Sequence, residues 1–364
     1  MKTDVRLLVI TLLATLIMAF SAQAQVAATV GQSQVGSLST LPESDLILYV
    51  NTSRIINEAM PRLLPEKELK EFREGMDQAK IFTGVDLRNV EMLVLAMRFN
   101  KPSADQVFPI PDAMILARGD FDAKALAGMA KMMSGGKLLE EKFGDHNLYL
   151  IKLSEISKEA SSNPLGAAFA EIAMTTLDGN TIAVGNTSYI KAALDAVDGR
   201  GRIKPETLAS AVRDPSALIS ASGSPLMAFA KSLGLKIIDN PDPNCMTKFG
   251  EYYLSLTMTS DSFKMNGAMN ADNPNTAALM KRMLSGLIDE GKSAVTDKNA
   301  KSVFDQVKLF TEGDELHAEV SVPQEMAAKL VREMLAPSPA KAAATGTKAT
   351  TKPGTRSRRS RRKT

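Results

Sequence analysis

The chain has 364 residues, of which 44% are hydrophobic and 23% charged, and Cys245 is its single cysteine. This composition is typical of a protein with a packed core, and one cysteine excludes an intramolecular disulfide. The formal net charge of +3 averages two unlike parts. Pro337–Thr364 carries nine basic residues and no acid, whereas Gln25–Ala336 carries 33 basic and 40 acidic residues. We therefore expect an acidic body with a basic C-terminal extension.

The first 24 residues follow the plan of a secretory signal peptide. Lys2 and Arg6 supply positive charge, residues 7–20 are apolar, and small residues precede a cleavage site expected between Ala24 and Gln25. Fourteen apolar residues fall short of the roughly 20 that span a bilayer, which argues against an uncleaved anchor. The sequence predicts an exported protein, periplasmic or extracellular, that is soluble after cleavage.

The folded body is expected to follow a flexible lead-in over residues 25–40, which are rich in Gln, Ala, Gly and Ser. Leu46–Val50 is expected to be a buried strand, and Ser53–Met60 a helix. A second strand–helix pair is expected at Ala217–Ser220 and Pro225–Leu233. Each pair precedes units in which two strands of alternating pattern lead into an amphipathic helix.

Four such hairpin–helix units are predicted, and one further hairpin has no helix. The units are Val90–Phe99 and Ala113–Ala117 with a helix from Asp122; Ile172–Leu177 and Thr181–Val184 with a helix from Thr187 or Ser188; Leu254–Met258 and Phe263–Met269 with a helix from Asn273-Pro274; and Val303–Phe310 and Leu316–Val320 with a helix from Pro323. The extra hairpin is Leu138–Phe143 with Leu148–Leu150.

These units predict an α+β fold made of two divergent copies of strand–helix plus hairpin–helix units. Paired strands favour antiparallel sheets, each with helices packed on one face, over a doubly wound parallel sheet. The expected organisation is a signal peptide (1–24), lead-in (25–40), first α+β domain (41–199), linker (200–215), second α+β domain (216–336) and disordered basic tail (337–364).

The segment Leu41–Asn51, which reads LPESDLILYVN, precedes and includes the first strand. It resembles the opening of the folded part in a family of uncharacterised bacterial exported proteins. In that family an apolar strand ends in Tyr-Val-Asp or a similar trio, whereas Asn51 stands here in place of Asp. The resemblance implies a bacterial envelope location and supplies no activity.

Gly286–Ser293 fits the phosphate-binding pattern G-x-x-x-x-G-K-S letter for letter. That pattern requires a loop between a strand and a helix. Here the apolar face of a predicted helix continues through Leu287 and Ile288, and Gly291 occupies the place of a helix C-terminal glycine. Asp289 would also repel phosphate, so no nucleotide is expected.

Two further patterns suggest chemistry. Ser134-Gly135-Gly136-Lys137 fits the Ser-x-x-Lys of penicillin-recognising enzymes, but its companion motifs are missing, and an exit from the preceding helix is the favoured interpretation. Glu315, His317 and Glu319 share one strand face and could hold Zn²⁺. An exposed, charged strand face explains the same spacing and is favoured, and the other histidine, His146, is expected in a solvated turn.

The tail concentrates positive charge at the C-terminus, where nucleic acid, anionic lipid headgroups or acidic glycans would be attracted. No aromatic residue is interleaved, so base stacking is not available. A solubilising extension without a partner is the alternative. The candidate polyanion contacts are Arg356, Arg358, Arg359, Arg361, Arg362 and Lys363.

These patterns favour a non-catalytic envelope protein whose body binds or scaffolds an unknown partner and whose tail attracts an anionic envelope polymer or lipid surface. No catalytic residue, metal or cofactor is indicated by any motif. Two alternatives stay open: an extracytoplasmic hydrolase whose site forms only in three dimensions, and a purely structural role in envelope assembly or stress tolerance.

Overall fold

The computed structural model describes residues 38–83, 86–99, 111–120, 122–152, 171–223, 249–295 and 298–335. The expected signal peptide, nearly all of the lead-in, the helix expected at Pro225–Leu233 and the basic tail lie outside these ranges.

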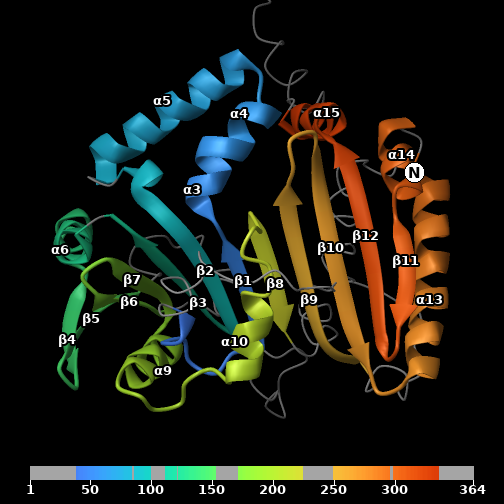
Figure 1. Ribbon diagram of the computed structural model, residues 1–364. Helices are drawn as coiled ribbons and strands as arrows, with labels where there is room; N and C mark the ends of the chain where they lie inside the picture. Colours follow the sequence, from blue (N-terminus) through green and yellow to red (C-terminus); the bar gives the residue numbers. More distant parts are fainter. Residues whose placement is uncertain are drawn as a thin grey trace, which may run out of the picture.

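The body is built on one sheet of twelve antiparallel strands, which confirms the α+β class and the antiparallel pairing (Figure 1). The strand order across the sheet is β11-β12-β10-β9-β8-β1-β2-β3-β7-β6-β5-β4. The strands are β1 Leu46–Val50, β2 Val90–Phe99, β3 Pro111–Gly119, β4 Leu139–Phe143, β5 His146–Lys152, β6 Glu171–Asp178, β7 Thr181–Asn186, β8 Ile219–Gly223, β9 Phe249–Met258, β10 Ser262–Ala271, β11 Lys308–Glu312 and β12 Glu315–Pro323.

The helices connect or follow these strands. They are α3 Thr52–Arg54, a π-helical turn Ile55–Ala59, α4 Met60–Leu63, α5 Glu66–Thr83, a 3-10 turn Leu87–Asn89, α6 Ala123–Met133, α9 Thr187–Val197, α10 Pro205–Ala211, α13 Pro274–Ala294, α14 Lys298–Asp305 and α15 Gln324–Leu335. Asp122 and Asn273 cap α6 and α13 with their side chains, as their positions in the sequence predict.

The two expected sets of strands join through β1 and β8, whose pairing places Leu48 opposite Ala221. The segment expected to be a linker, 200–215, contains α10, and its residues Ile203 and Ala211 are buried in the core. Both side chains belong to the largest hydrophobic core cluster, so the segment is part of the packed body.

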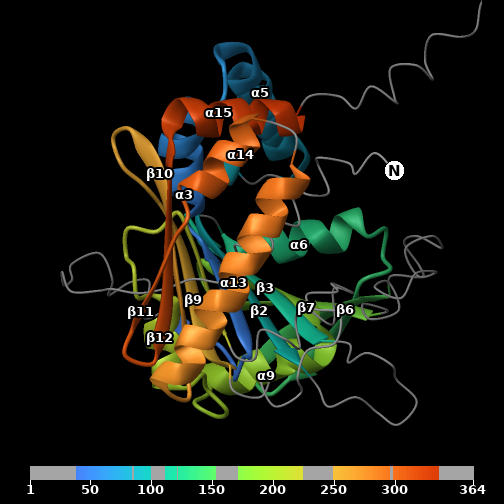
Figure 2. The ribbon, with the colours of Figure 1, turned by 90° about the vertical axis from the view of Figure 1, so that its right-hand side faces the viewer.

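Helices cover opposite faces in the two parts of the sheet. We define face A as the side that bears Ile47 and face B as the side that bears Leu48. On face A, α9 packs Tyr189, Ile190 and Leu194 into the largest core cluster, above β1–β7. On face B, α13 packs over β10–β12, and Figure 2 shows it running beside β11 and β12. One face of each part is thus covered by its own helices.

A row of paired residues makes the faces explicit, since cross-strand partners lie on the same side of a sheet. On face B the row is Glu140, Tyr149, Met174, Val184, Ile115, Leu95, Leu48, Ala221, Leu254, Gly267, Ala318 and Leu309. The neighbouring row on face A is Leu139, Leu150, Ala173, Gly185, Met114, Ala96, Ile47, Ser222, Tyr253, Ala268, His317 and Phe310.

Two expectations about local structure are wrong, and one helix was missed. The segment Val303–Phe310 was expected to be one strand, but it is helical to Asp305 and extended only from Lys308. Helix α5 was not predicted at all. The helix α9 has Asn186 as its N-cap residue, without a capping side-chain hydrogen bond, instead of Thr187 or Ser188. In the first case Val303 and Phe304 fit either a helical or an extended pattern, and packing against α13 decides for the helix.

Candidate functional site

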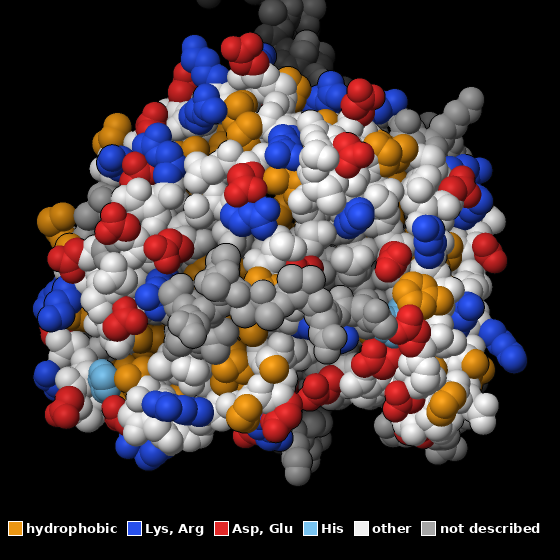
Figure 3. Space-filling view, in the orientation of Figure 1, with side chains coloured by type: hydrophobic (Ala, Val, Ile, Leu, Met, Phe, Trp, Pro, Cys, Tyr) orange, Lys and Arg blue, Asp and Glu red, His pale blue; other side chains and the backbone are white. Residues whose placement is uncertain are grey.

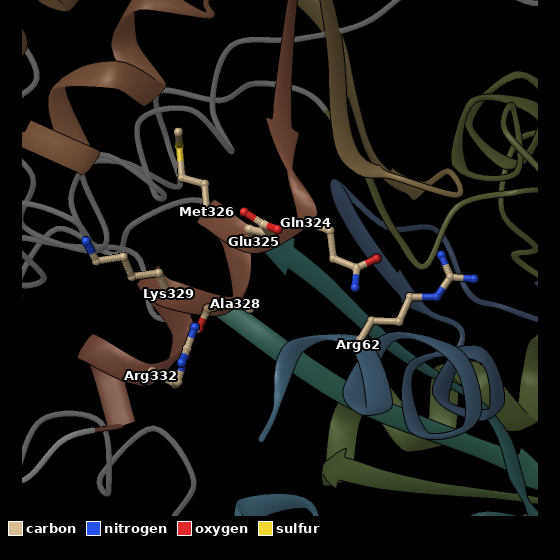
Figure 4. A pocket seen from close by; sticks show the side chains of 7 residues that line it. All are labelled: Arg62, Gln324, Glu325, Met326, Ala328, Lys329 and Arg332. Atoms are coloured by element: carbon tan, nitrogen blue, oxygen red, sulfur yellow. The ribbon is translucent and has the colours of Figure 1, made fainter. Parts of the chain in front are cut away.

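A cleft with a volume of about 540 Å³ lies between α4 and α15. Seven residues line it: Arg62, Gln324, Glu325, Met326, Ala328, Lys329 and Arg332 (Figure 4). Both walls are tied to the turn between β9 and β10. The Arg62 Nη1 group donates to the Thr259 carbonyl oxygen at 2.7 Å, and the Gln324 backbone N–H donates to the Asp261 carbonyl oxygen at 2.9 Å.

Local sequence explains why these two short walls stand apart. Pro61 lies inside the helical run 52–63 and has no N–H to donate, and a π-helical turn precedes it. Beneath the cleft, Ala59 and Leu63 meet Ala327 of α15 around Phe263. Apolar side chains thus hold the two helices together at the base, while their polar side chains remain at the rim.

Three of the four charged residues that line the cleft are basic. Arg62, Lys329 and Arg332 are exposed, and Glu325 is the one acidic residue among the seven. Among the residues that the structure describes, no acidic side chain forms an ion pair with any of the three cations. The Arg332 Nε–H donates to the Ala328 carbonyl oxygen of its own helix at 3.1 Å.

The three cationic groups do not converge on one point. Figure 4 shows Lys329 and Arg332 on one side of α15, with Arg62 across the cleft beyond Gln324. Separated charges suit a polyanion that runs along the surface better than one small anion held by several donors. The lining contains no Ser, Thr, Cys or His, and so it has no hydroxyl, thiol or imidazole group.

The wider surface carries no comparable concentration of one sign on the face that Figure 3 presents. Lys and Arg side chains are interspersed there with Asp and Glu. Several form short-range ion pairs on helices, such as Arg54 with Glu58 and Lys67 with Glu71. Arg62, Lys329 and Arg332 have no such ion-pair partner among the described residues.

The six tail residues named above as candidate polyanion contacts lie outside the described residues. The last described residue, Leu335, ends α15, so the tail follows directly from the helix that carries Lys329 and Arg332. Sequence reasoning missed the cleft. Its available signal was the i, i+3 spacing of Lys329 and Arg332 on a predicted helix, whereas Arg62 comes from a remote segment.

The Gly286–Ser293 pattern lies entirely inside α13, so it forms no phosphate-binding loop. Lys292 pairs with Asp305, and the Ser293 hydroxyl donates to the Asp289 carbonyl oxygen of the same helix. The expectation that Gly291 ends the helix is wrong, because α13 continues to Ala294. Gly291 instead leaves room for the buried ring of Phe304.

The Ser134–Lys137 segment is the exit from α6, as expected. Gly135 and Gly136 adopt positive φ angles of 62° and 83°, which end the helix. The Ser134 hydroxyl donates to the Lys131 carbonyl oxygen at 2.7 Å, which is the geometry of a helix C-terminus.

Both histidines lie in surroundings that differ from the expected solvated ones. His146 is half-buried, and its Nε2 atom lies 3.3 Å from the Asp198 carboxylate. This hydrogen bond holds the pKa of Asp198 below its usual value, with a smaller contribution from Arg200. His317 is 1% exposed, and its ring stacks on Phe310 with centroids 5.0 Å apart.

The expectation that Glu315, His317 and Glu319 form an exposed strand face is therefore wrong for His317, which is buried. His317 Nε2 lies 3.3 Å from the Glu315 carboxylate, but neither ring nitrogen has a partner in hydrogen-bond geometry. Within the described ranges, no three His, Cys, Asp or Glu side chains are placed to hold one metal ion.

In the same part of the chain, no helix combines the length and the apolarity needed to cross a membrane. No protein-family model and no curated protein matches this chain. Its similarities to solved structures include three crystal forms of TP0453. Form III has a TM-score of 0.43 and 14% identity and covers 81% of this chain and 97% of that chain.

Forms I and IV of TP0453 have TM-scores of 0.41 and 0.42 and identities of 13% and 10%. They cover 82% and 81% of this chain, and 97% and 95% of those chains. Similarity at this level transfers no function.

Proposed function

We propose that this protein is an exported, non-catalytic protein of the bacterial envelope that binds an anionic polymer or surface. The basic tail and the α4–α15 cleft supply the attraction, and the sheet body scaffolds the complex. The signal-peptide pattern and the resemblance at Leu41–Asn51 support the location. The observation that carries the proposal is the continuity of charge from the cleft into the tail.

Physically, the tail and the cleft act in the same way. The nine basic residues after Leu335 attract phosphate or carboxylate groups without reading their identity, since no aromatic residue accompanies them. Lys329 and Arg332 extend this charge onto the folded body, and Arg62 adds to it across the cleft. The acidic remainder of the body would repel a polyanion elsewhere, which directs binding to this end.

The test compares binding of three chains to duplex DNA, used only as a polyanion of known charge density, across a salt series. They are the mature chain from Gln25, a chain ending at Ala336, and the double variant Lys329→Glu/Arg332→Glu. Each phosphate contact contributes about −0.9 to the slope of log affinity against log salt. We expect truncation to reduce the slope by several units and the double variant by about two.

A matched control is Lys124→Glu/Lys142→Glu, on α6 and β4, which changes the net charge equally at exposed positions remote in sequence from the residues that line the cleft. If this control weakens binding as much as the cleft variant, net charge alone is responsible and the cleft has no role. If the full and truncated chains bind alike, or neither binds, the proposal is wrong.

A further inference from the structure

The sheet ends on one side in the strand β4, Leu139–Phe143. This strand pairs with β5 and has no second neighbour in the part of the chain that the structure describes. Figure 1 shows β4 at the outer side of the molecule. Four of its five residues are exposed and Phe143 is half-buried. An uncovered edge strand presents unpaired N–H and C=O groups, on which another strand can pair.

The turn that follows β4 fixes which of its backbone groups point outward. The turn has two residues, so Phe143 and His146, which flank it, exchange hydrogen bonds with each other. Hydrogen-bonded and non-hydrogen-bonded positions alternate along an antiparallel strand. Glu140 and Lys142 therefore direct their N–H and C=O groups away from β5, and the edge offers two donors and two acceptors.

The side chains of β4 are complementary to a second copy of the same strand. When two copies pair antiparallel about Glu141, Glu140 lies opposite Lys142 of the partner subunit, and Leu139 lies opposite Phe143 of the partner subunit. Opposed residues of paired strands share a face of the sheet, so the ionic pairs form on face B and the apolar pairs on face A. Because Glu140 and Lys142 are also the outward-facing positions, this register satisfies the free backbone groups of both copies.

The helices on the two faces fix the acidic side chains of the edge. On face B, the Lys131 Nζ group of α6 donates to the Glu140 carboxylate at 2.7 Å, and on face A the Lys191 Nζ group of α9 donates to the Glu141 carboxylate at 3.0 Å. In the paired strands Glu141 meets its own copy, and directly opposed like charges are destabilising. The Lys191 ammonium group of each copy offsets that repulsion.

The exposed side chains of β4 also distinguish it from a protected edge. Short, charged edge strands usually resist pairing, because their charges repel or stay hydrated. In β4 the outward-facing charges have opposite signs and meet as complementary pairs. Leu139 is 57% exposed, and the pairing would bury it against an aromatic ring.

The opposite edge of the sheet, β11, is less accessible. Three of its five residues are half-buried, and α13 contacts the strand. Figure 2 shows α13 running alongside β11. The two edges of one sheet thus offer a candidate surface and a matched control.

We propose that β4 pairs with β4 of a second copy of this chain, so that the sheet continues across a two-fold axis from one copy to the other. This inference goes beyond the proposed function and uses neither the cleft nor the tail. Pairing by one short strand indicates a reversible dimer, not an obligate one. Because the contact is closed by symmetry and occupies both β4 edges, association should end at the dimer.

The first experiment measures sedimentation of the mature chain across a concentration series. Lys142→Pro removes an N–H group that the pairing needs and that β5 does not use, and proline is tolerated on an edge strand at such a position. We expect it to weaken dimerisation roughly tenfold or more, with an unchanged circular dichroism spectrum. Thr311→Pro, at an outward-facing position of β11, is the matched control and should change dimerisation less than about twofold.

A charge exchange tests the register independently of folding. Lys142→Glu opposes two carboxylates in each of two pairs, and Glu140→Lys opposes two ammonium groups, so each variant alone should stay monomeric. A mixture of the two variants restores opposite charges in both pairs and should form a mixed dimer. Mixing cannot repair a chain that fails to fold, so restoration identifies the pairing.

Four results would overturn the proposal. They are a mature chain that stays monomeric throughout the series, dimerisation unchanged by Lys142→Pro, folded single variants that form no mixed dimer, and species larger than a dimer. The last result would assign β4 to pairing with a different edge, such as β11, which leaves the assembly open-ended.

The dimer and the polyanion binding are tested apart. The chain ending at Ala336 should dimerise like the mature chain, because the edge lies in the folded body, and loss of the dimer on truncation would assign association to the tail and overturn the proposal. The DNA titrations use protein concentrations below those at which the mature chain dimerises. The Lys142→Glu change in their control then acts through net charge alone.

Discussion

The two parts of the sheet differ in which of their faces are apolar and which face a helix covers. In β1–β7 both faces are apolar, and α9 covers face A, whereas on face B Ile115 is 52% exposed. In β9–β12 face B is apolar and covered by α13, whereas face A carries polar side chains such as Ser255, Asn266 and His317. The comparison teaches that an apolar strand pattern does not by itself decide which face is covered.

The largest expected effect comes from two adjacent residues of β3. Leu116→Ala should reduce the free energy of unfolding by about 2–5 kcal/mol, because Leu116 is fully buried under α9 and truncation leaves a cavity. Ile115→Ala, on the open face, should cost less than about 1 kcal/mol. Urea denaturation of the mature chain measures both, and equal costs would show that face B is covered as tightly as face A.

The next largest effect is a loss of stability at alkaline pH, caused by Tyr189 in the core on face A. Burial raises the pKa of Tyr189 to about 12, against an ordinary value near 10. Since the folded-state pKa lies above the unfolded one, the stabilisation is complete below pH 10 and is lost as pH rises from 10 to 12. Two pKa units correspond to at most about 2.7 kcal/mol.

Unfolding free energies at pH 8, 10 and 11 measure this loss. Tyr189→Phe should flatten the profile, although it also removes the hydroxyl that contacts Ser44 at 2.7 Å and the Glu43 carbonyl oxygen at 3.2 Å. An unchanged pH profile in Tyr189→Phe would assign the alkaline instability to other groups.

The smallest effect distinguishes two glycines of α13, on the covered face of β9–β12. Gly286→Ala should stabilise the protein by about 0.5–1 kcal/mol, because alanine favours a helix and no atom lies within 4 Å of the added carbon. Gly291→Ala should destabilise it by about 1 kcal/mol, because the added carbon would lie 2.9 Å from the Phe304 ring. Thermal unfolding of the two variants should shift in opposite directions.

Much of the local structure could be predicted from the sequence. The strands Leu46–Val50 and Val90–Phe99 have the predicted bounds, because the apolar run in one and the alternation in the other end at clear boundaries. Helix α5 could have been found, since Leu69, Phe72 and Met76 follow helical spacing between charged residues. The many charges obscured that pattern.

The candidate site could not be predicted in the same way. Arg62 and Lys329 are far apart in the sequence, and only the packing of Ala59 and Ala327 around Phe263 brings their helices together. The burial of His317 is equally non-local, because the alternation of β12 places it on a face without saying whether that face is covered.

The sequence by itself determined most of the strands, the helices that follow the hairpins, the caps of α6 and α13, and the separation of an acidic body from a basic tail. These features depend on residues a few positions apart. The tertiary structure alone decided that β1 pairs with β8 in one continuous sheet, that α9 and α13 cover opposite faces, and that Leu116 is buried while Ile115 is exposed. Those outcomes depend on contacts between segments many residues apart, whose free energy no local pattern records.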